Sequence, residues 1–413
     1  MKKHVYLFNE GSRASVYGIG TYIRQMIACL KLTPDIELHI IQLNTNIEHF
    51  EIKEEKGYDV YNCPCASVWV RDKAERYFRN ICFLLRLHIP VNEHDKNYFL
   101  FNYTSHLPLV SAIKICYSGC TIFFTIHYQD WCFALNGDVS HLKKIIHTKN
   151  TETLPSSEQN VYDSYLKEKR MYQSVDKVIC LSNFTRMLLQ EEYGITQERT
   201  VLIYNGLKDE GKILSFKERN ALKKQLHFLS KEKIILFVGR LDPIKGIKTL
   251  VMAFQYLIQE NPDYRLVVIG DGDFQSCLSE CGTNWNKITF TGRLEKDKLY
   301  DFYQIADVGV MPSMHEQCSY VAIEMMMFGI PMVISTTTGL KEMMPNKDFG
   351  FTFTMKNEDK TMVQELAKLI SNVLTIPSEK KIKIKNLSRF YYEKAYSESK
   401  MQREYINLLI SEM

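Results

Sequence analysis

Hydrophobic and polar positions along the chain form blocks that repeat. Short apolar runs, typical of strands buried on both faces, recur between stretches with the three-to-four spacing of amphipathic helices. In the first half the predicted strands are 4–8, 37–43, 98–101, 121–127, 177–181 and 200–203. In the second half the predicted strands are 233–238, 265–269, 288–291 and 307–311, and the predicted helices are 246–260, 296–305 and 319–328. Strands that alternate with helices predict an α/β protein with doubly wound parallel sheets.

The length of the chain indicates two domains. At 413 residues it exceeds one ordinary hydrophobic core. The turn Asn205-Gly206 ends the first predicted domain, 1–205, and a charged, poorly patterned stretch to about residue 231 links to the second, 206–392. The polar segment 136–159 is predicted to be a long loop, and 388–413 is predicted to be helical.

The stretch 312–331 carries the strongest chemical signal, and its sequence is PSMHEQCSYVAIEMMMFGIP. Ser319 can cap a helix that ends before Gly329 and Pro331, so Glu316 lies in the turn ahead of the helix and Glu324 on its second turn. A helix N-terminus suits a diphosphate, and a carboxylate on either side of it suits hydroxyl groups at the two ends of one ligand. The alternative is a pair of solvated glutamates, which fits poorly with the apolar residues around Glu324.

A second motif follows the first strand of the second domain, where residues 237–246 read FVGRLDPIKG. Arg240 and Lys245 are expected at the carboxyl end of that strand, where doubly wound sheets bind ligands. Two cations there would neutralise a diphosphate and the charge that grows as a sugar–phosphate bond breaks. The alternative is a capped loop with two solvated cations.

These motifs resemble the E-x7-E signature and the phosphate-binding loop of retaining, nucleotide-sugar-dependent glycosyltransferases of family 4. The resemblance implies the GT-B fold, in which two Rossmann-like domains with doubly wound parallel sheets face a central cleft. It also implies that the first domain binds the acceptor, that the second binds the donor, and that the last helix, about 393–413, packs back on the first domain. The family commonly has Gly-Phe-Gly after the first glutamate, where this chain has Gln317, Cys318 and Ser319.

The resemblance implies a role for each matching residue. The expected catalytic residues are Glu316, Arg240, Lys245 and His127, the last at the end of a predicted strand. The expected donor-binding residues are Glu324, Gly18, Gly20, Asn205, Gly239, Arg293, Cys318, Ser319 and Tyr320. The implied reaction moves a sugar from a nucleotide diphosphate sugar to a glycan, lipid-linked or peptide acceptor, in cell-surface glycan or glycoconjugate biosynthesis. No metal is implied and no cofactor beyond the nucleotide sugar as co-substrate.

Other function classes fit the sequence less well. Gly18-Ile19-Gly20 lacks the full G-x-G-x-x-G fingerprint, and no acidic residue ends the second strand, which argues against a nicotinamide dehydrogenase. A formal charge of +4 is too small to indicate nucleic acid. Two alternatives stay open. One is another GT-B enzyme, such as a nucleotide-sugar epimerase or a phosphorolytic transferase. The other is a non-catalytic nucleotide-sugar-binding subunit of a glycan assembly complex.

The chain is expected to be cytoplasmic. Its N-terminal apolar run is too short for a signal peptide, no window reaches 18 apolar residues, and its eleven cysteines are expected to be reduced thiols. Cys63-Pro-Cys65 is the only close pair, and no histidine spacing completes a zinc site. The stretch 68–89 interleaves arginines with aromatic residues. Two interpretations remain, a helix resting on the inner face of a membrane and an ordinary core-facing helix with a solvated side.

Overall fold

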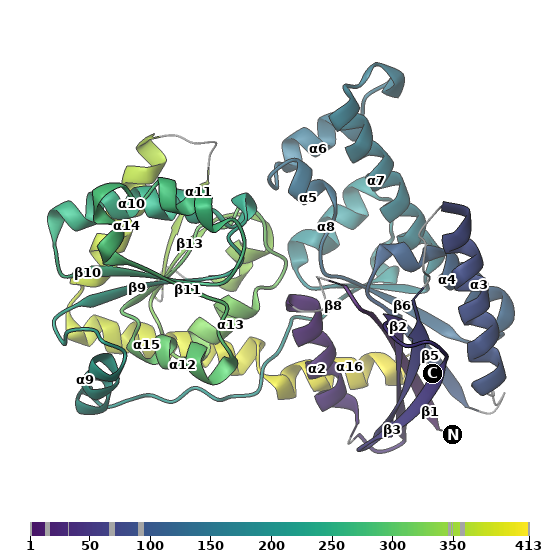
Figure 1. Cartoon of the computed structure of the whole chain (residues 1–413). Coiled ribbons are helices and arrows are strands. Elements are labelled where there is room, and N and C mark those ends of the chain that lie inside the picture. Colours follow the sequence, from purple (N-terminus) through teal and green to yellow (C-terminus); the bar gives the residue numbers. More distant parts are fainter. Residues whose placement is uncertain are drawn as a thin grey trace. The chain divides into compact units, whose positions relative to one another are not determined.

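The structure is a computed structural model that describes residues 2–12, 17–31, 33–65, 71–89, 95–345, 348, 350–355 and 360–411, with backbone only for 71–74. The chain divides into two compact units (Figure 1). Unit 1 runs to Asn205 and includes the segment from Glu398 onward, and unit 2 comprises Gly206–Ser397. Each unit is built on a largely parallel sheet, so the predicted α/β class with two doubly wound sheets is confirmed.

Within its described residues, unit 1 has an eight-stranded sheet in the order β3-β4-β2-β1-β5-β6-β7-β8. The strands are β1 (Lys3–Glu10), β2 (Ile36–Thr45), β3 (Glu51–Glu55), β4 (Tyr58–Pro64), β5 (Lys96–Phe101), β6 (Thr121–Ile126), β7 (Lys177–Cys180) and β8 (Thr200–Leu202). All neighbours are parallel except β3 and β4, an antiparallel edge pair that the sequence pattern did not predict. The strand order reverses between β1 and β5, which is the switch point of a doubly wound sheet.

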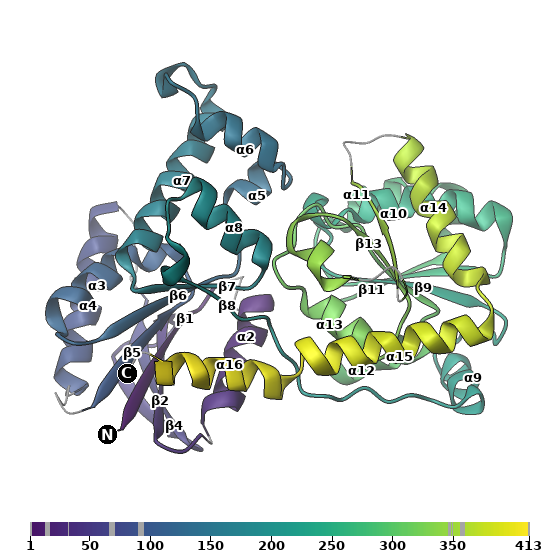
Figure 2. The ribbon, with the colours of Figure 1, turned by 180° about the vertical axis from the view of Figure 1, so that it is seen from behind.

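Helices cover both faces of this sheet. They are α2 (Gly18–Leu30), α3 (Arg71–His88), α4 (Leu107–Cys116), α5 (Trp131–Ala134), α6 (Val139–Ile146), α7 (Ser156–Ser174), α8 (Asn183–Glu192) and α16 (Glu398–Ser411). Figure 2 shows α3, α4 and α7 on one face and α2 with α16 on the other. The Tyr405 hydroxyl of α16 lies 2.6 Å from that of Tyr22 in α2, so the end of the chain is bonded into the first unit.

Unit 2 has a six-stranded, fully parallel sheet over its described residues, in the order β11-β10-β9-β12-β13-β14. The strands are β9 (Lys233–Val238), β10 (Tyr264–Ile269), β11 (Ile288–Gly292), β12 (Val308–Met311), β13 (Met332–Ser335) and β14 (Gly350–Phe353). This is the strand order of a dinucleotide-binding sheet, and its switch point lies between β9 and β12.

The helices of unit 2 are α9 (Phe216–Gln225), α10 (Ile247–Glu260), α11 (Phe274–Ser279), α12 (Lys296–Ile305), α13 (Tyr320–Met327), α14 (Lys360–Thr375) and α15 (Ser378–Ala395). Figure 1 shows α10, α11 and α14 on one face and α12, α13 and α15 on the other. Fully buried Ile235 of β9 packs in one cluster with Leu250 and Phe254 of α10 and Leu366 of α14. Burying each such side chain contributes about 1.5–3 kcal/mol, which holds β9 and the loop that follows it in place.

The predicted loop 136–159 is in fact largely helical, and the predicted linker 206–231 contains one helix. The stretch 136–159 contains α6 and the start of α7, and Asp138 caps α6 by accepting a bond from the amide of His141 (3.0 Å). The stretch 206–231 contains α9, which begins with a capping box between Ser215 and Glu218. The loop prediction for 136–159 was wrong because α6 has only eight residues, which leave little periodicity to detect, although the cap at Asp138 was readable.

Further differences concern the end of the chain and the membrane. The predicted helical segment 388–413 is divided between α15 and α16 by a break at Tyr396 and Ser397.

In the described part of the chain, none of the helices combines the length and apolar character that a membrane span requires. All eleven cysteines are free thiols.

Candidate functional site

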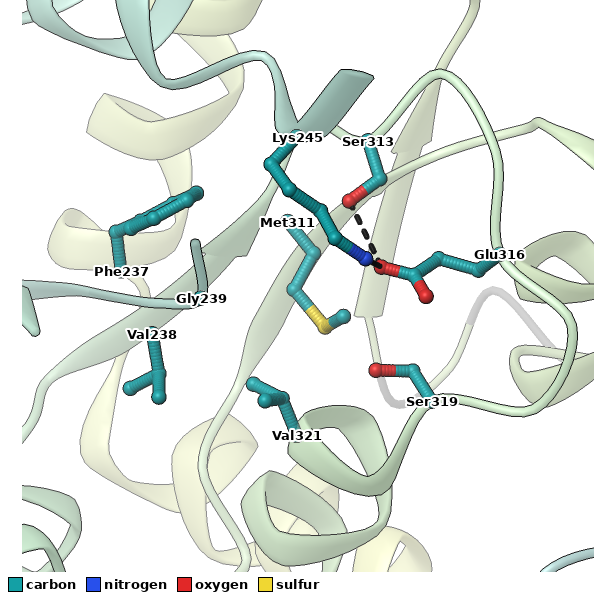
Figure 3. A pocket seen from close by; sticks show the side chains of 9 residues that line it. All are labelled: Phe237, Val238, Gly239, Lys245, Met311, Ser313, Glu316, Ser319 and Val321. Carbon is teal, nitrogen blue, oxygen red and sulfur yellow. Dashed lines mark hydrogen bonds and ion pairs between the residues drawn. The ribbon is translucent and has the colours of Figure 1, made fainter. Parts of the chain in front are cut away.

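The switch point of unit 2 brings Lys245 and Glu316 together. Lys245 ends the short helix η4 (Pro243–Lys245) between β9 and α10, and Glu316 lies in the loop between β12 and α13. The Lys245 ammonium donates to Glu316 Oε1 at 2.6 Å, and the Ser313 hydroxyl donates to the same oxygen at 3.0 Å (Figure 3). The side chains of Lys245 and Glu316 are 21% and 13% exposed, so the ion pair is shielded from water yet reachable by a ligand.

The backbone of Glu316 is held by the segment after β13. Its amide donates to the Thr338 hydroxyl (3.0 Å), while its carbonyl accepts bonds from that hydroxyl (2.7 Å) and from the amide of Gly339 (2.9 Å). Thr338 has a φ of 36°, which is strained for a β-branched residue and costs of the order of 1–3 kcal/mol. The sequence interpretation missed Thr338, although the run of hydroxyl side chains 335–338 at the end of β13 was a readable signal.

A pocket opens beside this ion pair. Its volume, including the part open to solvent, is about 280 Å³. It is lined by Phe237, Val238, Gly239, Lys245, Met311, Ser313, Glu316, Ser319 and Val321 (Figure 3). Ser319 caps α13 by accepting a bond from the amide of Ala322 (3.4 Å), and the first turn of α13 has no acidic residue. The pocket therefore combines a helix N-terminus, an ammonium, a carboxylate and hydroxyls, groups that suit phosphate and sugar ligands.

Glu324 lies on α13 beside the buried Tyr303, whose hydroxyl donates to Glu324 Oε2 at 2.7 Å. Burial raises the pKa of Glu324 to about 7, because an ionised carboxylate loses hydration among apolar neighbours; the Tyr303 bond and Lys296 oppose this effect. The solvated-glutamate alternative therefore does not hold for this residue. Tyr303, on α12, was not identified from the sequence, because nothing in the local pattern marks which helix packs beside α13.

Stability should depend on pH through Glu324. Since its pKa in the folded protein exceeds the ordinary 4.5, its stabilising contribution is complete below pH 4.5 and is lost as the pH rises through about 7. Between pH 5 and pH 8 the unfolding free energy of the wild type should fall through this group by about 2–3 kcal/mol. The Glu324→Gln variant lacks the titrating carboxyl, so its unfolding free energy should not show this part of the fall. Urea denaturation of both proteins at the two pH values measures this difference, and parallel pH profiles would contradict it.

Gly246 allows the two loops to meet. It has a φ of 67° and joins η4 to α10, and a Cβ atom there would lie 2.0 Å from the carbonyl oxygen of Pro312. The backbone beside Lys245 therefore touches the backbone that leads to Glu316. No residue other than glycine fits both the left-handed conformation and this contact.

Gly246→Ala should consequently destabilise unit 2 by about 2 kcal/mol or more, from the left-handed backbone together with the overlap on Pro312. The matched control is Gly282→Ala, because Gly282 is also left-handed (φ 54°) but a Cβ atom on it would meet nothing within 4 Å. Thermal unfolding compares the two variants, and an equal loss in both would show that the close approach has no effect.

The other predicted residues of unit 2 lie near this edge but do not line the pocket. Arg240 forms an ion pair with Asp242 (3.1 Å), and Arg293 is exposed just after β11. Cys318 is buried ahead of α13, and Tyr320 is the first residue of that helix. Of the predicted donor and catalytic residues, the pocket thus unites Gly239, Lys245, Glu316 and Ser319.

In unit 1 the predicted residues follow the carboxyl ends of the strands. His127 directly follows β6, and its Nε2 atom lies 2.9 Å from Asn102 Oδ1. Burial lowers the pKa of His127 to about 3, so the ring is neutral. Gly18 and Gly20 begin α2, where a Cβ on Gly18 would meet nothing within 4 Å, so packing does not require glycine there. Asn205 is buried at the end of the unit.

Comparisons with known proteins match both units. The family model "Glycosyltransferase Family 4" matches residues 16–210, and the model "Glycosyl transferases group 1" matches residues 218–389. The uncharacterized glycosyltransferase MJ1607 of Methanocaldococcus jannaschii is 29% identical over 310 residues, which cover 71% of this chain and 77% of MJ1607.

Solved structures share the fold over the whole chain. Sucrose-phosphate synthase from Thermosynechococcus elongatus superposes with a TM-score of 0.75 at 19% identity, covering 99% of both chains. Anabaena Alr3699/HepE, solved in complex with UDP-glucose, superposes with a TM-score of 0.68 at 16% identity, also covering 99% of both. These structures establish a GT-B fold, and the two family models together match most of the chain. The chain belongs to the family 4-type glycosyltransferases.

Proposed function

We propose that this glycosyltransferase transfers a sugar from a nucleotide diphosphate sugar to an acceptor hydroxyl with retention of configuration, in the synthesis of a surface glycan or glycoconjugate. The observation that carries the proposal is the Lys245–Glu316 ion pair, which lies in a pocket beside the N-terminus of α13 at the switch point of a doubly wound sheet. The complex of Alr3699/HepE with UDP-glucose supports the donor class.

Each group has a proposed task. Lys245 and Arg240 bind the diphosphate, Glu316 accepts bonds from sugar hydroxyls, and Glu324 accepts bonds from the ribose. Neutral His127 of unit 1 bonds a sugar hydroxyl, which its pKa of about 3 permits at any physiological pH. The protein thus contributes positioning and charge stabilisation, with cationic side chains in place of a metal ion.

The proposed reaction proceeds on one face of the sugar. The bond between the anomeric carbon and the phosphate oxygen breaks, and its electron pair stays on the phosphate. The acceptor oxygen forms its bond to the anomeric carbon on the same face, and the acceptor proton passes to the departing phosphate. Lys245 stabilises the negative charge that develops on this leaving group.

A panel of sugar nucleotides tests the donor site by thermal shift, since a ligand that binds the folded state raises its melting temperature. The donor identified in this way is then incubated with the enzyme alone and with candidate acceptors, and the products are identified. Release of nucleoside diphosphate with a glycosylated acceptor supports the proposal. Isomerised donor would indicate an epimerase, and binding without any turnover, including hydrolysis, would indicate a non-catalytic subunit.

An acceptor at a membrane surface is a second part of the proposal, and it rests on α3. Arg76, Arg79 and Arg86 are exposed on this helix with Phe83 (65% exposed) and Leu87 (61% exposed). The other aromatic residues of the stretch do not add to this exposed side. Phe78 is buried, and the Tyr77 hydroxyl donates to the Pro64 carbonyl (3.0 Å). Residue 69 lies outside the described residues. The helix thus has an ordinary buried side and an exposed basic, apolar side that suits an anionic lipid surface.

Reversing Arg76 and Arg79 to glutamate should reduce sedimentation with vesicles that contain anionic lipid, because each basic residue near such a surface contributes about 1 kcal/mol. Lys217→Glu, on the exposed side of α9, is the control and should leave sedimentation unchanged. Equal sedimentation of the double variant and wild type, or none of wild type, removes the membrane part of the proposal.

A further inference from the structure

Two histidines and a carboxylate converge at the opposite end of the unit 1 sheet from His127. His4 lies near the start of β1, and Glu37 and His39 lie near the start of β2. The strand register pairs His4 with Glu37 and Tyr6 with His39, so the three side chains lie on one face at the amino edge of the sheet. One ligand atom from each of His4, Glu37 and His39 lies within 4.8 Å of the other two.

Two of the distances inside this cluster match those of a metal site. His4 Nδ1 lies 3.3 Å from His39 Nε2 and 3.3 Å from Glu37 Oε2. Ligand atoms that bind a tetrahedral zinc ion at about 2.0–2.1 Å are separated from one another by roughly 3.3–3.4 Å. The side chains of His4 and His39 are only 19% and 11% exposed, while Glu37 is 42% exposed, which leaves an entry path for an ion.

The second nitrogen of each ring faces a carboxylate. His4 Nε2 lies 3.7 Å from Asp95 Oδ2, and His39 Nδ1 lies 3.4 Å from Asp59 Oδ2. A carboxylate favours the N–H tautomer at the nitrogen it faces, so Asp59 leaves the lone pair of His39 on Nε2, directed toward His4. Asp95 would have the same effect on His4 once an ion replaces the proton between His4 and Glu37. Carboxylates in this position are the usual partners of histidines that bind metals.

Without an ion, a proton on His4 Nδ1 bridges to His39 Nε2 or to Glu37 Oε2, each at 3.3 Å. A divalent cation in place of that proton would contact all three groups at once, since their ligand atoms lie within 4.8 Å of one another. Imidazole nitrogens together with one carboxylate oxygen form a donor set that suits zinc and similar divalent ions. The other oxygen of Glu37 pairs with the Lys2 ammonium, so the oxygen that faces His4 is oriented by that contact.

We propose that His4, Glu37 and His39 form a structural site for a divalent transition-metal ion of the zinc class. The ion links β1 to β2 directly. Through Asp59 of β4 and Asp95, which precedes β5, it also ties the neighbouring strands at the amino edge. This edge lies opposite the carboxyl ends of the strands, so the site stabilises unit 1 and takes no part in sugar transfer.

The test uses the full chain after removal of metal with a chelator, and titrates Zn²⁺ against a chromophoric competitor. We expect one tight site per chain and a higher melting temperature with Zn²⁺. His4→Gln and His39→Gln should each raise the dissociation constant by about tenfold or more, and Asp59→Asn and Asp95→Asn by roughly tenfold. Glu37→Gln, at the most exposed ligand, provides the same comparison if a histidine variant fails to fold.

Two controls exclude other ligands. His141 pairs with a single carboxylate, Glu158, at 2.9 Å, so His141→Gln should leave the affinity unchanged. The spectrum of the Co²⁺-loaded protein should lack thiolate charge-transfer absorption, which excludes the eleven cysteines. The absence of a stoichiometric site, full affinity in the variants of His4, Glu37 and His39, or a thiolate spectrum would each overturn the proposal. None of these measurements depends on glycosyltransferase activity.

Discussion

Lys245→Ala should lower kcat for sugar transfer by about 10²-fold or more. Lys245 is held 2.6 Å from Glu316, and the two side chains are only 21% and 13% exposed, so the fixed ammonium stabilises developing charge more strongly than it would in water. Because the charge on the leaving phosphate grows as the sugar bond breaks, the loss should appear mainly in kcat. Steady-state kinetics with saturating donor and acceptor measures it.

The matched control is Lys231→Ala. Lys231 also forms an ion pair, with Asp263 at 2.9 Å, but it precedes the amino end of β9, at the edge of the sheet opposite Lys245. Its removal should leave kcat unchanged. The comparison therefore separates the effect of losing any lysine ion pair from the effect of losing the cation that stabilises the leaving group. A Lys245→Ala effect confined to the KM for the acceptor would contradict the proposed role.

Glu316→Ala should reduce transfer by about 10³-fold, the largest effect expected for a single residue of unit 2. The substitution removes the acceptor proposed for the sugar hydroxyls and also leaves the Lys245 ammonium and the Ser313 hydroxyl without their shared partner. Single-turnover measurements with saturating donor separate this loss from weaker binding. Glu365→Ala, on the exposed side of α14, is the control and should be inert.

The ion pair also predicts how the two substitutions combine. Since Lys245 and Glu316 contact each other, their effects should not add, and the double alanine variant should lose less than the product of the two single losses. Near-normal turnover of Glu316→Ala with saturating donor would refute its role in holding the sugar. Strict additivity would indicate that the pair separates completely when the donor binds.

Much of the site was predictable because its signals are local. Lys245 precedes a glycine that the left-handed turn requires, Ser319 caps the helix that follows, and Glu324 has apolar neighbours in sequence. Each of these features depends on residues within one or two turns of the chain, where conformational preferences act directly. The same reasoning fails for 136–159, because α6 spans only eight residues and α7 lies mostly beyond the segment, so little of either helical period falls within it.

The sequence by itself determined the alternation of strands and helices, the two-domain α/β class, and the loops that carry Lys245 and Glu316. Only the tertiary structure decided which residues from distant segments become neighbours. Thr338 supports Glu316, Tyr303 bonds Glu324, and His4 meets His39 because of helix packing, strand order and register. Periodicity specifies which face of a strand is buried, but the neighbour of that strand is selected by the packing of the whole sheet, which no local spacing encodes.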